Sequence, residues 1–322
     1  MARPLVALTG ATGFLGRRLA PALARAGARV RLLVRRDPID AGWRDFEPEV
    51  VIGALGQPRA LDALVDGVDG LVHAAALIKA TSREAFFAVN ARGAGELGQR
   101  LASRAPHAHG VLVSTLAARE PALSAYAASK AAGEAAFLEA LGGQASVMRP
   151  TAVYGPGDRE TFTLFRAAAL SPILPVLSED ARLTLVHVDD LAEAIVRRVL
   201  GPPTGATEAV CDDRPQGYGW REILEALAAA AGSRPRLART PPGLVRTASR
   251  LSGLGRIFGA NPMLTPEKAN ELLHPDWSIA PGELAPDRPC VRYDLSGGFA
   301  DAADWYRTAG WLPHPRANCA PG

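Results

Sequence analysis

The 322-residue sequence has only three cysteines, Cys211, Cys290 and Cys319, and they are too far apart to suggest a metal knuckle or a redox pair. Three unpaired cysteines do not fit a disulfide framework, so we expect a reducing compartment. No apolar run approaches the roughly 18 residues that a membrane span needs. The opening residues enter a strand-like apolar run at once, which does not fit a signal peptide. We therefore expect a soluble, cytoplasmic protein without a membrane span.

An excess of one charge is also lacking. The 36 Lys and Arg residues nearly balance the 33 Asp and Glu residues, which leaves a net charge of +3. A protein that binds nucleic acid usually has a concentrated basic face, so we expect no nucleic-acid partner. We also expect no metal site. Hydrophobic residues make up 48% of the chain, as in ordinary globular enzymes. The length suffices for one large domain or two moderate ones.

Short apolar runs alternate with helical patterns in the first half of the chain. This alternation predicts an α/β fold with a doubly wound parallel sheet covered by helices on both faces. The sixth strand ends at Pro150, which cannot donate to a ladder. The expected strands are 4–10, 28–35, 49–53, 70–76, 110–115 and 145–150, and the expected helices are 14–27, 58–66, 83–104 and 126–141.

The second half is richer in proline and glycine, and we expect it to form a smaller, helix-rich C-terminal lobe that binds the substrate. A strand–helix pattern at 182–200 predicts a return to the main sheet. The larger domain would then comprise 1–154 and 182–202, and the lobe 155–181 and 203–322, with a loose tail at 314–322. Helices are expected near 160–170, 219–231, 265–274 and 298–309, and Pro/Gly clusters lie at 155–157, 172–175, 201–205 and 241–243.

The segment TGATGFLG places Gly10, Gly13 and Gly16 between the first strand and the first helix. Glycines allow a tight turn and the close approach of a diphosphate, and the helix N-terminus offers free N–H groups and a positive dipole end. A ligand-free glycine turn is the alternative. The position at the start of a β/α series favours a dinucleotide site, and hence a Rossmann domain.

The end of the second strand should indicate which dinucleotide binds. An acidic residue there binds a free ribose 2′-hydroxyl, whereas an arginine accepts a 2′-phosphate. The sequence has Arg35 and Arg36 at this point, and Asp37 comes two residues too late. We expect NADP rather than NAD, with two solvated surface charges as the alternative interpretation.

Tyr126 and Lys130 lie four residues apart in an alanine-rich helical pattern. Their i, i+4 spacing places both on one helix face. A lysine ammonium favours phenolate over phenol, which brings the tyrosine pKa from its usual ~10 towards neutrality. A surface Tyr–Lys pair on an amphipathic helix is the alternative. It is disfavoured because the preceding strand ends in Ser114 and Thr115, whose hydroxyls can bind a substrate carbonyl.

This set of motifs resembles the short-chain dehydrogenase/reductase superfamily, and within it the extended and atypical NAD(P)-dependent epimerase/dehydratase branch. The resemblance runs from residue 5 to about residue 200. Besides the glycine motif, it rests on HAAA at 73–76, VNARGAGEL at 89–97, STLAAREPALSAYAASK at 114–130, RPTAVYGPGD at 149–158 and HVDDLAEAI at 187–195.

The resemblance implies a role for each matching residue. Tyr126 would be the general acid/base, and Lys130 would lower its pKa and hold the nicotinamide ribose. Thr115 would supply the substrate-binding hydroxyl, with Ser114 as the alternative, and Asn90 would be structural. His187 and Asp189–Asp190 look like the start of a scaffold helix. The cofactor contacts that we expect are Gly10, Thr12, Gly13, Phe14, Leu15, Gly16, Arg35, Arg36, Ala54, Leu55, Ala74, Ala75, Ala76, Thr115, Tyr126, Lys130, Pro150 and Val153.

Three departures from the family pattern are visible. Ala54 stands where the family often has an aspartate that binds the adenine amine, so that hydrogen bond must come from elsewhere. The spacing from hydroxyl to tyrosine is shorter than in many sugar epimerases and suits the atypical branch. Ala152 replaces an asparagine that sugar-nucleotide members usually carry, which weakens a sugar-nucleotide interpretation.

The leading hypothesis is an NAD(P)-dependent oxidoreductase that transfers hydride between nicotinamide and a carbonyl or secondary alcohol of a small molecule. A sugar-nucleotide epimerase or dehydratase is one alternative. A non-catalytic dinucleotide-binding scaffold, resembling the accessory subunit of respiratory complex I, is the other. Trp277 and His274 could face a ligand, although packing at a helix end is favoured because Pro275 stops a helix. A homodimer is a candidate assembly.

Overall fold

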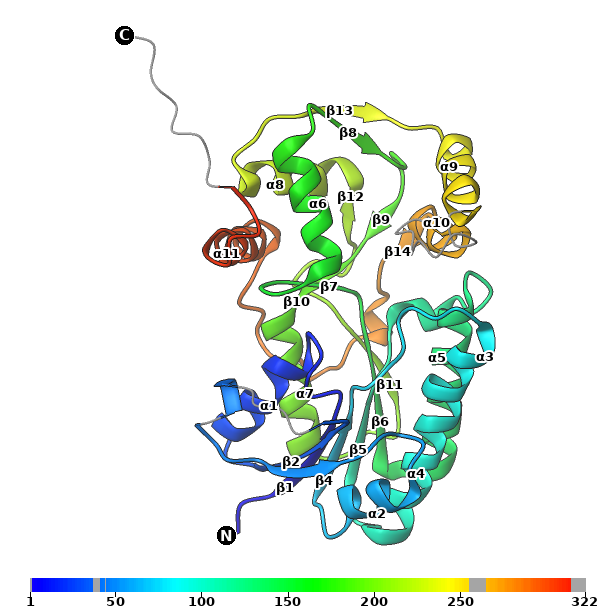
Figure 1. The fold of residues 1–322 in the computed structure, drawn as a ribbon, viewed down its shortest axis with the longest axis vertical. Helices are drawn as coiled ribbons and strands as arrows, with labels where there is room; N and C mark the ends of the chain where they lie inside the picture. Colours follow the sequence, from blue (N-terminus) through cyan, green and yellow to red (C-terminus); the bar gives the residue numbers. More distant parts are fainter. Residues whose placement is uncertain (1, 37–40, 44, 255–264, 314–322) are drawn as a thin grey trace. The chain divides into compact units, whose positions relative to one another are not determined.

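The computed structural model describes residues 2–36, 41–43, 45–254 and 265–313 (Figure 1). Asp37, Cys319 and the expected tail at 314–322 lie outside the described residues. The chain divides into two compact units. The first comprises residues 1–151, 188–211 and 281–290, and the second comprises 152–187, 212–280 and 291–322. Relative to the expected division, 152–154 and 182–187 group with the second unit, and 203–211 and 281–290 with the first.

A seven-stranded parallel sheet forms the centre of the first unit. Its order is β3-β2-β1-β4-β5-β6-β11, so the strand order reverses between β1 and β4. This is the doubly wound arrangement that the alternating pattern predicted, and the point of reversal is where such sheets bind ligands. The strands are β1 (Leu5–Thr9), β2 (Arg29–Val34), β3 (Glu49–Ile52), β4 (Gly70–His73), β5 (His109–Val113), β6 (Ala145–Pro150) and β11 (Thr207–Val210).

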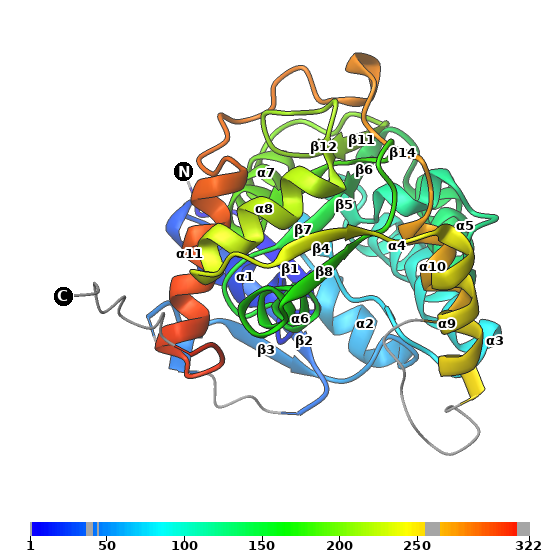
Figure 2. The same ribbon diagram turned by 90° about the horizontal axis from the view of Figure 1, so that it is seen from above.

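Helices cover both faces of this sheet (Figures 1 and 2). Helix α1 (Gly16–Arg25) packs against α7 (Val188–Leu200), and α7 also contacts β4 and β5. Helices α2 (Pro58–Val65), α4 (Gly93–Arg104) and α5 (Ala125–Leu141) pack together, and their leucines and Phe137 are buried against the strands. Burial on both faces explains why these strands are almost wholly apolar.

The expected helix at 83–104 has an irregular middle. It consists of α3 (Arg83–Phe86), one π-helical segment, η2 (Phe87–Arg92), and α4. Helix α5 approaches η2 closely at Gly133, where an added Cβ would lie 2.1 Å from the backbone oxygen of Asn90. A π-helical turn inserts one extra residue into a helix, which changes the direction of the side chains around it. Here the segment carries the buried Asn90.

The expected return of 182–200 to the main sheet is wrong for its strand and right for its helix. Strand β9 (Arg182–Leu183) pairs with β12 (Tyr218–Gly219) and β14 (Asp276–Trp277), and β10 (Leu185–His187) pairs with β7 (Ala152–Tyr154). The seventh strand of the main sheet is instead β11. An apolar run predicts a strand, but it does not indicate which strand will be its neighbour.

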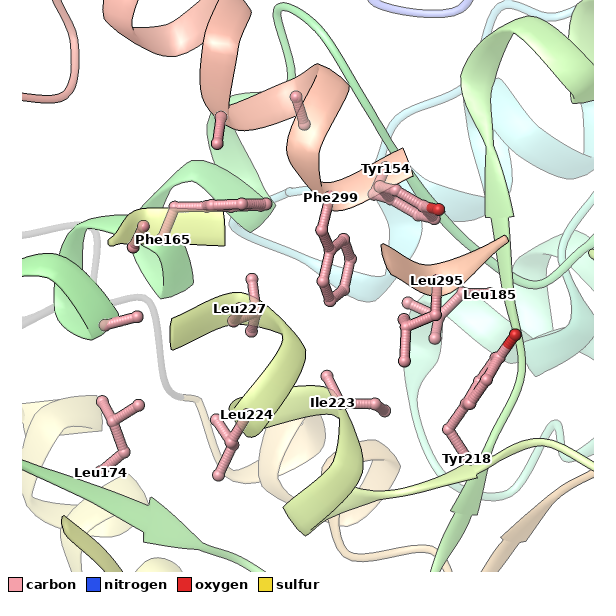
Figure 3. Packing of buried hydrophobic residues seen from close by; sticks show 14 of the residues in the cluster. Tyr154, Phe165, Leu174, Leu185, Tyr218, Ile223, Leu224, Leu227, Leu295 and Phe299 are labelled. Carbon is pink, nitrogen blue, oxygen red and sulfur yellow. The ribbon is translucent and has the colours of Figure 1, made fainter. Parts of the chain in front are cut away.

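The second unit has its own hydrophobic core (Figure 3). Helices α6 (Arg159–Leu170), α8 (Trp220–Ala231) and α11 (Leu295–Thr308) enclose it, together with β8 (Ile173–Val176) and β13 (Arg236–Arg239). Tyr154 meets Phe299 edge to face with 4.9 Å between ring centroids, and Phe165 meets the same ring at 5.4 Å. Such aromatic pairs stabilise a core beyond the area that they bury.

The second unit also contains α9 (Pro242–Leu254) and α10 (Pro266–Leu272), which pack against each other. No helix was expected at the proline–glycine cluster of 241–243. Instead, Pro242 is the first residue of α9, a position that tolerates proline because its N–H would be unpaired anyway.

The remaining described elements are the 3₁₀ turns η1 (Ala41–Trp43), η3 (Leu116–Arg119), η4 (Gly142–Gln144) and η6 (Pro281–Glu283), all in the first unit.

Candidate functional site

Two glycines of the glycine loop are required by packing. Gly10 has φ +78°, and a Cβ there would lie 2.7 Å from the backbone nitrogen of Ala75 at the end of β4. A Cβ on Gly16 would lie 2.1 Å from the backbone oxygen of Gly10. These close approaches join β1, the first turn of α1 and the β4 end into one rigid edge.

The third glycine leaves space instead of filling it. A Cβ on Gly13 would meet only the Gly10 oxygen, at 3.2 Å. Beside it, the backbone N–H groups of Phe14, Leu15 and Gly16 have no hydrogen-bond acceptor among the described residues. Free N–H groups at a helix N-terminus bind anions such as phosphate. The loop therefore fits the diphosphate of a dinucleotide.

The expected adenosine end of the site is open to solvent. Arg35 and Arg36 directly follow β2 and are both exposed. After β3, the N–H of Ala54 donates to Oε1 of Gln57 at 3.1 Å, and Leu55 packs against the core. The side chain of Gln57 is therefore the polar group that the structure provides next to Ala54, where the family pattern has an aspartate.

The end of β4 is held by a buried histidine. Nδ1 of His73 lies 2.7 Å from Oγ1 of Thr9, and that oxygen also accepts the N–H of Ala75 at 3.1 Å. The threonine hydroxyl therefore links the ring of His73 to the backbone just beyond β4. Burial, reinforced by the charge of Lys130, lowers the pKa of His73 to about 3, so the ring stays neutral. The pair fixes the backbone at Ala74–Ala76.

Helix α5 carries the tyrosine and the lysine on one face. Its N-cap Ser124 accepts the N–H of Ala127 at 3.0 Å, which fixes where the helix begins. Lys130 is buried, and its Nζ donates to the backbone oxygen of Val113 at 2.7 Å. Burial lowers the pKa of Lys130 to about 8, and the charge of Glu134 opposes this effect. Tyr126, one turn earlier, is partly exposed.

The two hydroxyls after β5 have different surroundings. Ser114 is buried and donates to Oε1 of Glu134, whose carboxylate also receives two hydrogen bonds from Arg149, at 2.9 and 2.6 Å. Thr115 is partly exposed and caps η3 by accepting the N–H of Ala117 at 3.3 Å. Ser114 is thus committed to a buried ion pair, whereas the side chain of Thr115 lies at the open end of the strand.

A second buried network orients the backbone of α5. The amide of Asn90 binds both polar groups of the Leu77 backbone, with its oxygen 2.7 Å from the Leu77 nitrogen and its nitrogen 2.9 Å from the Leu77 oxygen. The same amide nitrogen donates to the hydroxyl of Ser129 at 3.0 Å, and Ser129 donates to the backbone oxygen of Tyr126 at 2.7 Å. Asn90 therefore ties the β4 end to the turn of α5 that carries Tyr126.

The remaining candidates are spread over both units. Pro150 ends β6 in the first unit, whereas Val153 lies in β7 of the second. Asp189 and Asp190 occupy the first turn of α7, where their negative charges interact favourably with the positive end of the helix dipole. His274 and Trp277 pack on each other at the end of α10, with ring centroids 4.5 Å apart, and the indole nitrogen donates to Glu271 O.

Glu134, Arg149, Thr9 and His73 were not singled out by the motifs. Glu134 stands four residues after Lys130 on the same helix, a spacing that the sequence already displays. Its partner Arg149 comes from β6, and nothing in the sequence indicates that pairing. Among the described residues, no group of three or more His, Cys, Asp or Glu side chains could hold a metal ion, and no helix is long and apolar enough to cross a bilayer.

Comparison with known proteins agrees with this geometry. The model of the NAD dependent epimerase/dehydratase family matches residues 6–207, which is more than half of the sequence. The chain belongs to this family. It is therefore an enzyme of a nicotinamide-dependent family. The glycine loop, the Tyr126–Lys130 pair and nearly all of strands β1 to β6 fall within the matched residues, whereas β11 begins where the match ends.

Individual members extend the likeness beyond the matched region. A ceramide reductase of Caulobacter vibrioides is 48% identical over 313 residues, which cover 97% of each chain. The mitochondrial NADH dehydrogenase [ubiquinone] 1 alpha subcomplex subunit 9 of Dictyostelium discoideum is 26% identical over 229 residues, 68% of this chain and 61% of that one. The crystal structure of gox2253 shares the fold with a TM-score of 0.78 at 21% identity, covering 97% of this chain and all of the other.

Proposed function

We propose that this protein is an NAD(P)H-dependent reductase that converts a ketone of a ceramide-type lipid to a secondary alcohol. The observation that carries the chemistry is the pair on α5, where the buried ammonium of Lys130 is held at the β5 end, one turn from Tyr126. The substrate class rests on the likeness to the Caulobacter vibrioides ceramide reductase, which extends over 97% of both chains.

Tyr126 donates the proton in this reaction, and Lys130 makes it a stronger acid. A cation near the phenol stabilises the phenolate that forms when the proton leaves. Because Lys130 Nζ is fixed on Val113 O, its charge stays at the strand end and cannot move into solvent. Thr115 donates a hydrogen bond to the substrate oxygen, since the hydroxyl of Ser114 is engaged by Glu134.

The first unit would bind the dinucleotide, and the open space at Gly13 and the free N–H groups that follow would hold its diphosphate. When bound, the reduced nicotinamide supplies a hydride to the carbonyl carbon, while the proton from Tyr126 goes to the oxygen. One ketone, one NAD(P)H and one proton give one secondary alcohol and one NAD(P)⁺. Arg35 and Arg36 favour NADPH, and the second unit contributes the binding surface for the lipid.

The chemistry of ceramides narrows the reacting group. A ceramide is an N-acyl amino alcohol, and its amide carbonyl is stabilised by resonance against hydride attack. The amino alcohol part also has a secondary hydroxyl. A ketone in place of that hydroxyl has no such resonance stabilisation and accepts a hydride more readily. The reducible substrate is therefore the ketone form of the lipid, and the product is the N-acyl amino alcohol, that is, the ceramide.

Two other functions remain as alternatives. Epimerisation or dehydration of a sugar nucleotide is disfavoured by Ala152, where sugar-nucleotide members usually have an asparagine. A non-catalytic role is suggested by the 26% identity to the NADH dehydrogenase subunit. The Tyr126–Lys130 pair argues against a non-catalytic role. Burial of Lys130 destabilises its charged form, and a scaffold would not need a buried ammonium.

The test is turnover of a ketone-containing N-acyl amino alcohol with NADPH, compared between the wild type and Tyr126→Phe. Phenylalanine keeps the ring and removes the transferable proton, so we expect turnover to fall by roughly 10²–10⁴-fold with an unchanged dissociation constant for NADPH. Retention of most activity by Tyr126→Phe would refute the assignment of the acid.

A matched pair of variants separates the two hydroxyls. Thr115→Ala should lower turnover with little change in stability. Ser114→Ala should keep turnover but reduce the free energy of unfolding by about 1–3 kcal/mol, because it removes one partner of a buried carboxylate. The reverse pattern would assign the substrate hydroxyl to Ser114.

A further inference from the structure

The charge of the chain is distributed unevenly. Residues 226–266 contain six arginines, no lysine and no acidic residue, although the whole chain has a net charge of only +3. The rest of the chain therefore carries a net charge of −3. A stretch of this length without a single carboxylate cannot neutralise its own arginines by local ion pairs.

The described arginines of this stretch are exposed. They lie just before β13, within β13, and along α9, which follows β13 directly in the second unit (Figures 1 and 2). None of their side chains has an ion-pair partner among the described residues. These five are Arg234, Arg236, Arg239, Arg246 and Arg250.

Apolar side chains lie exposed beside these cations. β13 runs parallel to β8 with Arg236 opposite Ile173 and Ala238 opposite Pro175, and all four of these residues are exposed. The residues between them point inward, so the outer face of this small sheet has three apolar positions and one arginine. An outer face of a sheet normally carries polar residues.

Two large leucines extend the apolar character of this surface. Leu170, at the end of α6 three residues before Ile173, is 62% exposed, and Leu244, in the first turn of α9, is 61% exposed. Ile173 itself is 55% exposed. β13 pairs with β8, and α9 begins three residues after β13 ends. We call these exposed apolar residues and the arginines of β13 and α9 the basic–apolar face of the second unit.

We propose that the basic–apolar face binds the surface of an anionic phospholipid bilayer. Arginines attract phosphate and anionic headgroups, and exposed leucine and isoleucine side chains enter the boundary between headgroups and acyl chains. Nucleic acid would use the arginines but would leave the aliphatic side chains in water. This inference goes beyond the reductase activity, although a peripheral contact with the bilayer would suit an enzyme whose substrate is a lipid.

The experiment is co-sedimentation of the full chain with vesicles, without substrate or cofactor. We expect binding to vesicles of phosphatidylcholine containing phosphatidylglycerol as the minor component, and little binding to phosphatidylcholine alone. Arg236→Ala/Arg239→Ala should weaken binding by roughly 30-fold, since each basic residue near an anionic surface contributes about 1 kcal/mol and 1.4 kcal/mol is tenfold. The matched control is Arg25→Ala/Arg288→Ala, which removes two exposed arginines of the first unit and should bind like the wild type.

A second variant tests the apolar contribution. Leu244→Gln should weaken binding in high salt as well as in low salt, whereas the arginine variant should differ from the wild type chiefly in low salt. Circular dichroism establishes that each variant is folded.

Three outcomes overturn the proposal: equal binding to neutral vesicles, equal losses in both double variants, or no vesicle binding by a folded wild type. Binding of a DNA duplex, or self-association lost in Arg236→Ala/Arg239→Ala, in the absence of vesicle binding, would give the face to another partner. Because no turnover is measured, failure here leaves the reductase proposal standing, and failure of the reductase leaves this result intact.

Discussion

Arg35 is the first residue after β2, and the next described residue is a second arginine, Arg36, and not an acidic residue that could bind a free ribose diol. The adenosine 2′-phosphate adds nearly two negative charges, and an arginine fork can bind it with charge-assisted hydrogen bonds. Each such bond contributes about 1.5–3 kcal/mol, so we expect NADPH to bind roughly tenfold to a few-hundredfold more tightly than NADH. The measurement is the ratio of the two dissociation constants at one salt concentration.

Arg35→Ala should reduce this ratio and leave the affinity for NADH nearly unchanged. Arg25→Ala removes an exposed arginine far along α1 and serves as the control for a general change in charge. A wild-type preference for NADH, or a ratio that Arg35→Ala does not alter, would contradict the interpretation of this strand end.

We expect Lys130 to give the proposed reaction a pH dependence. Burial lowers its pKa to about 8, so the ammonium loses its charge as the pH rises through this value. Tyr126 then becomes a weaker acid, and we expect the rate of ketone reduction to fall above about pH 8. Stability should change in the opposite direction. The unfolded lysine holds its proton up to about pH 10.5, so the free energy of unfolding should rise by up to about 1.4 kcal/mol per pH unit between the two values.

Lys130→Arg provides the control for this prediction, because a guanidinium stays protonated throughout the range. Its rate will be lower than that of the wild type, but its pH profile should lack the fall above pH 8. A fall that persists in Lys130→Arg would assign the titration to another group. Unfolding curves of both proteins at pH 7.5 and above measure the stability effect.

At the scale of the helices and strands, the sequence predicts those with a regular apolar pattern well. The six strands from β1 to β6 lie where the apolar runs placed them. The inner strands are buried on both faces and are apolar for that reason, whereas β3, at the edge of the sheet, is apolar but half exposed. The partner of β10 and the place of β11 were not predictable, since pairing depends on tertiary contacts. Helix α9 was missed because Pro242 indicates a break in a helix interior and a start at the first position.

The candidate site follows the same division. Its glycine loop and its Tyr–Lys pair are local in sequence, and their spacing together with their positions after β1 and β5 suggested them as candidates. The Glu134–Arg149 ion pair joins α5 to β6, and the Asn90–Ser129 hydrogen bond joins η2 to α5. Such contacts between distant segments leave no periodic signal. The surroundings of Ser114 and Thr115 differ because Ser114 donates to Glu134 of this ion pair, a contact that only the structure shows.

The glycine loop allows a prediction about the strand–helix connection as a whole. Gly13→Val should abolish dinucleotide binding with only a moderate loss of stability, because its side chain would enter the open space beside the free N–H groups. Gly16→Val should instead destabilise the fold, since its Cβ would lie 2.1 Å from the Gly10 backbone oxygen. Calorimetry with NADPH and thermal unfolding of both variants test the contrast, and unchanged affinity in Gly13→Val would contradict it.

At the scale of the whole molecule, two kinds of similarity cover different parts of the chain. The family model ends at residue 207, so it includes the glycine loop and the Tyr–Lys pair but little of the second unit. The likeness to the ceramide reductase continues over 97% of the chain. If the proposed function is correct, we expect specificity for the substrate to come largely from the part that the family model does not cover.

The balance of cofactor during turnover distinguishes the three functions that remain. A reductase consumes one NADPH for each alcohol formed. An epimerase or dehydratase reduces and reoxidises its bound cofactor within one cycle and consumes none, and a scaffold binds the dinucleotide without turnover. We expect one equivalent of NADPH to be oxidised per ketone when the substrate is the oxidised form of an N-acyl amino alcohol, and none with a uridine diphosphate sugar.

Absorbance of NADPH and mass spectrometry of the lipid, measured on the same sample, give the ratio of NADPH oxidised to alcohol formed. Tyr126→Phe is the control for uncatalysed oxidation of the cofactor. Conversion of a sugar nucleotide without net loss of NADPH would show that the chemistry is epimerisation and that the likeness to a ceramide reductase does not extend to its substrate.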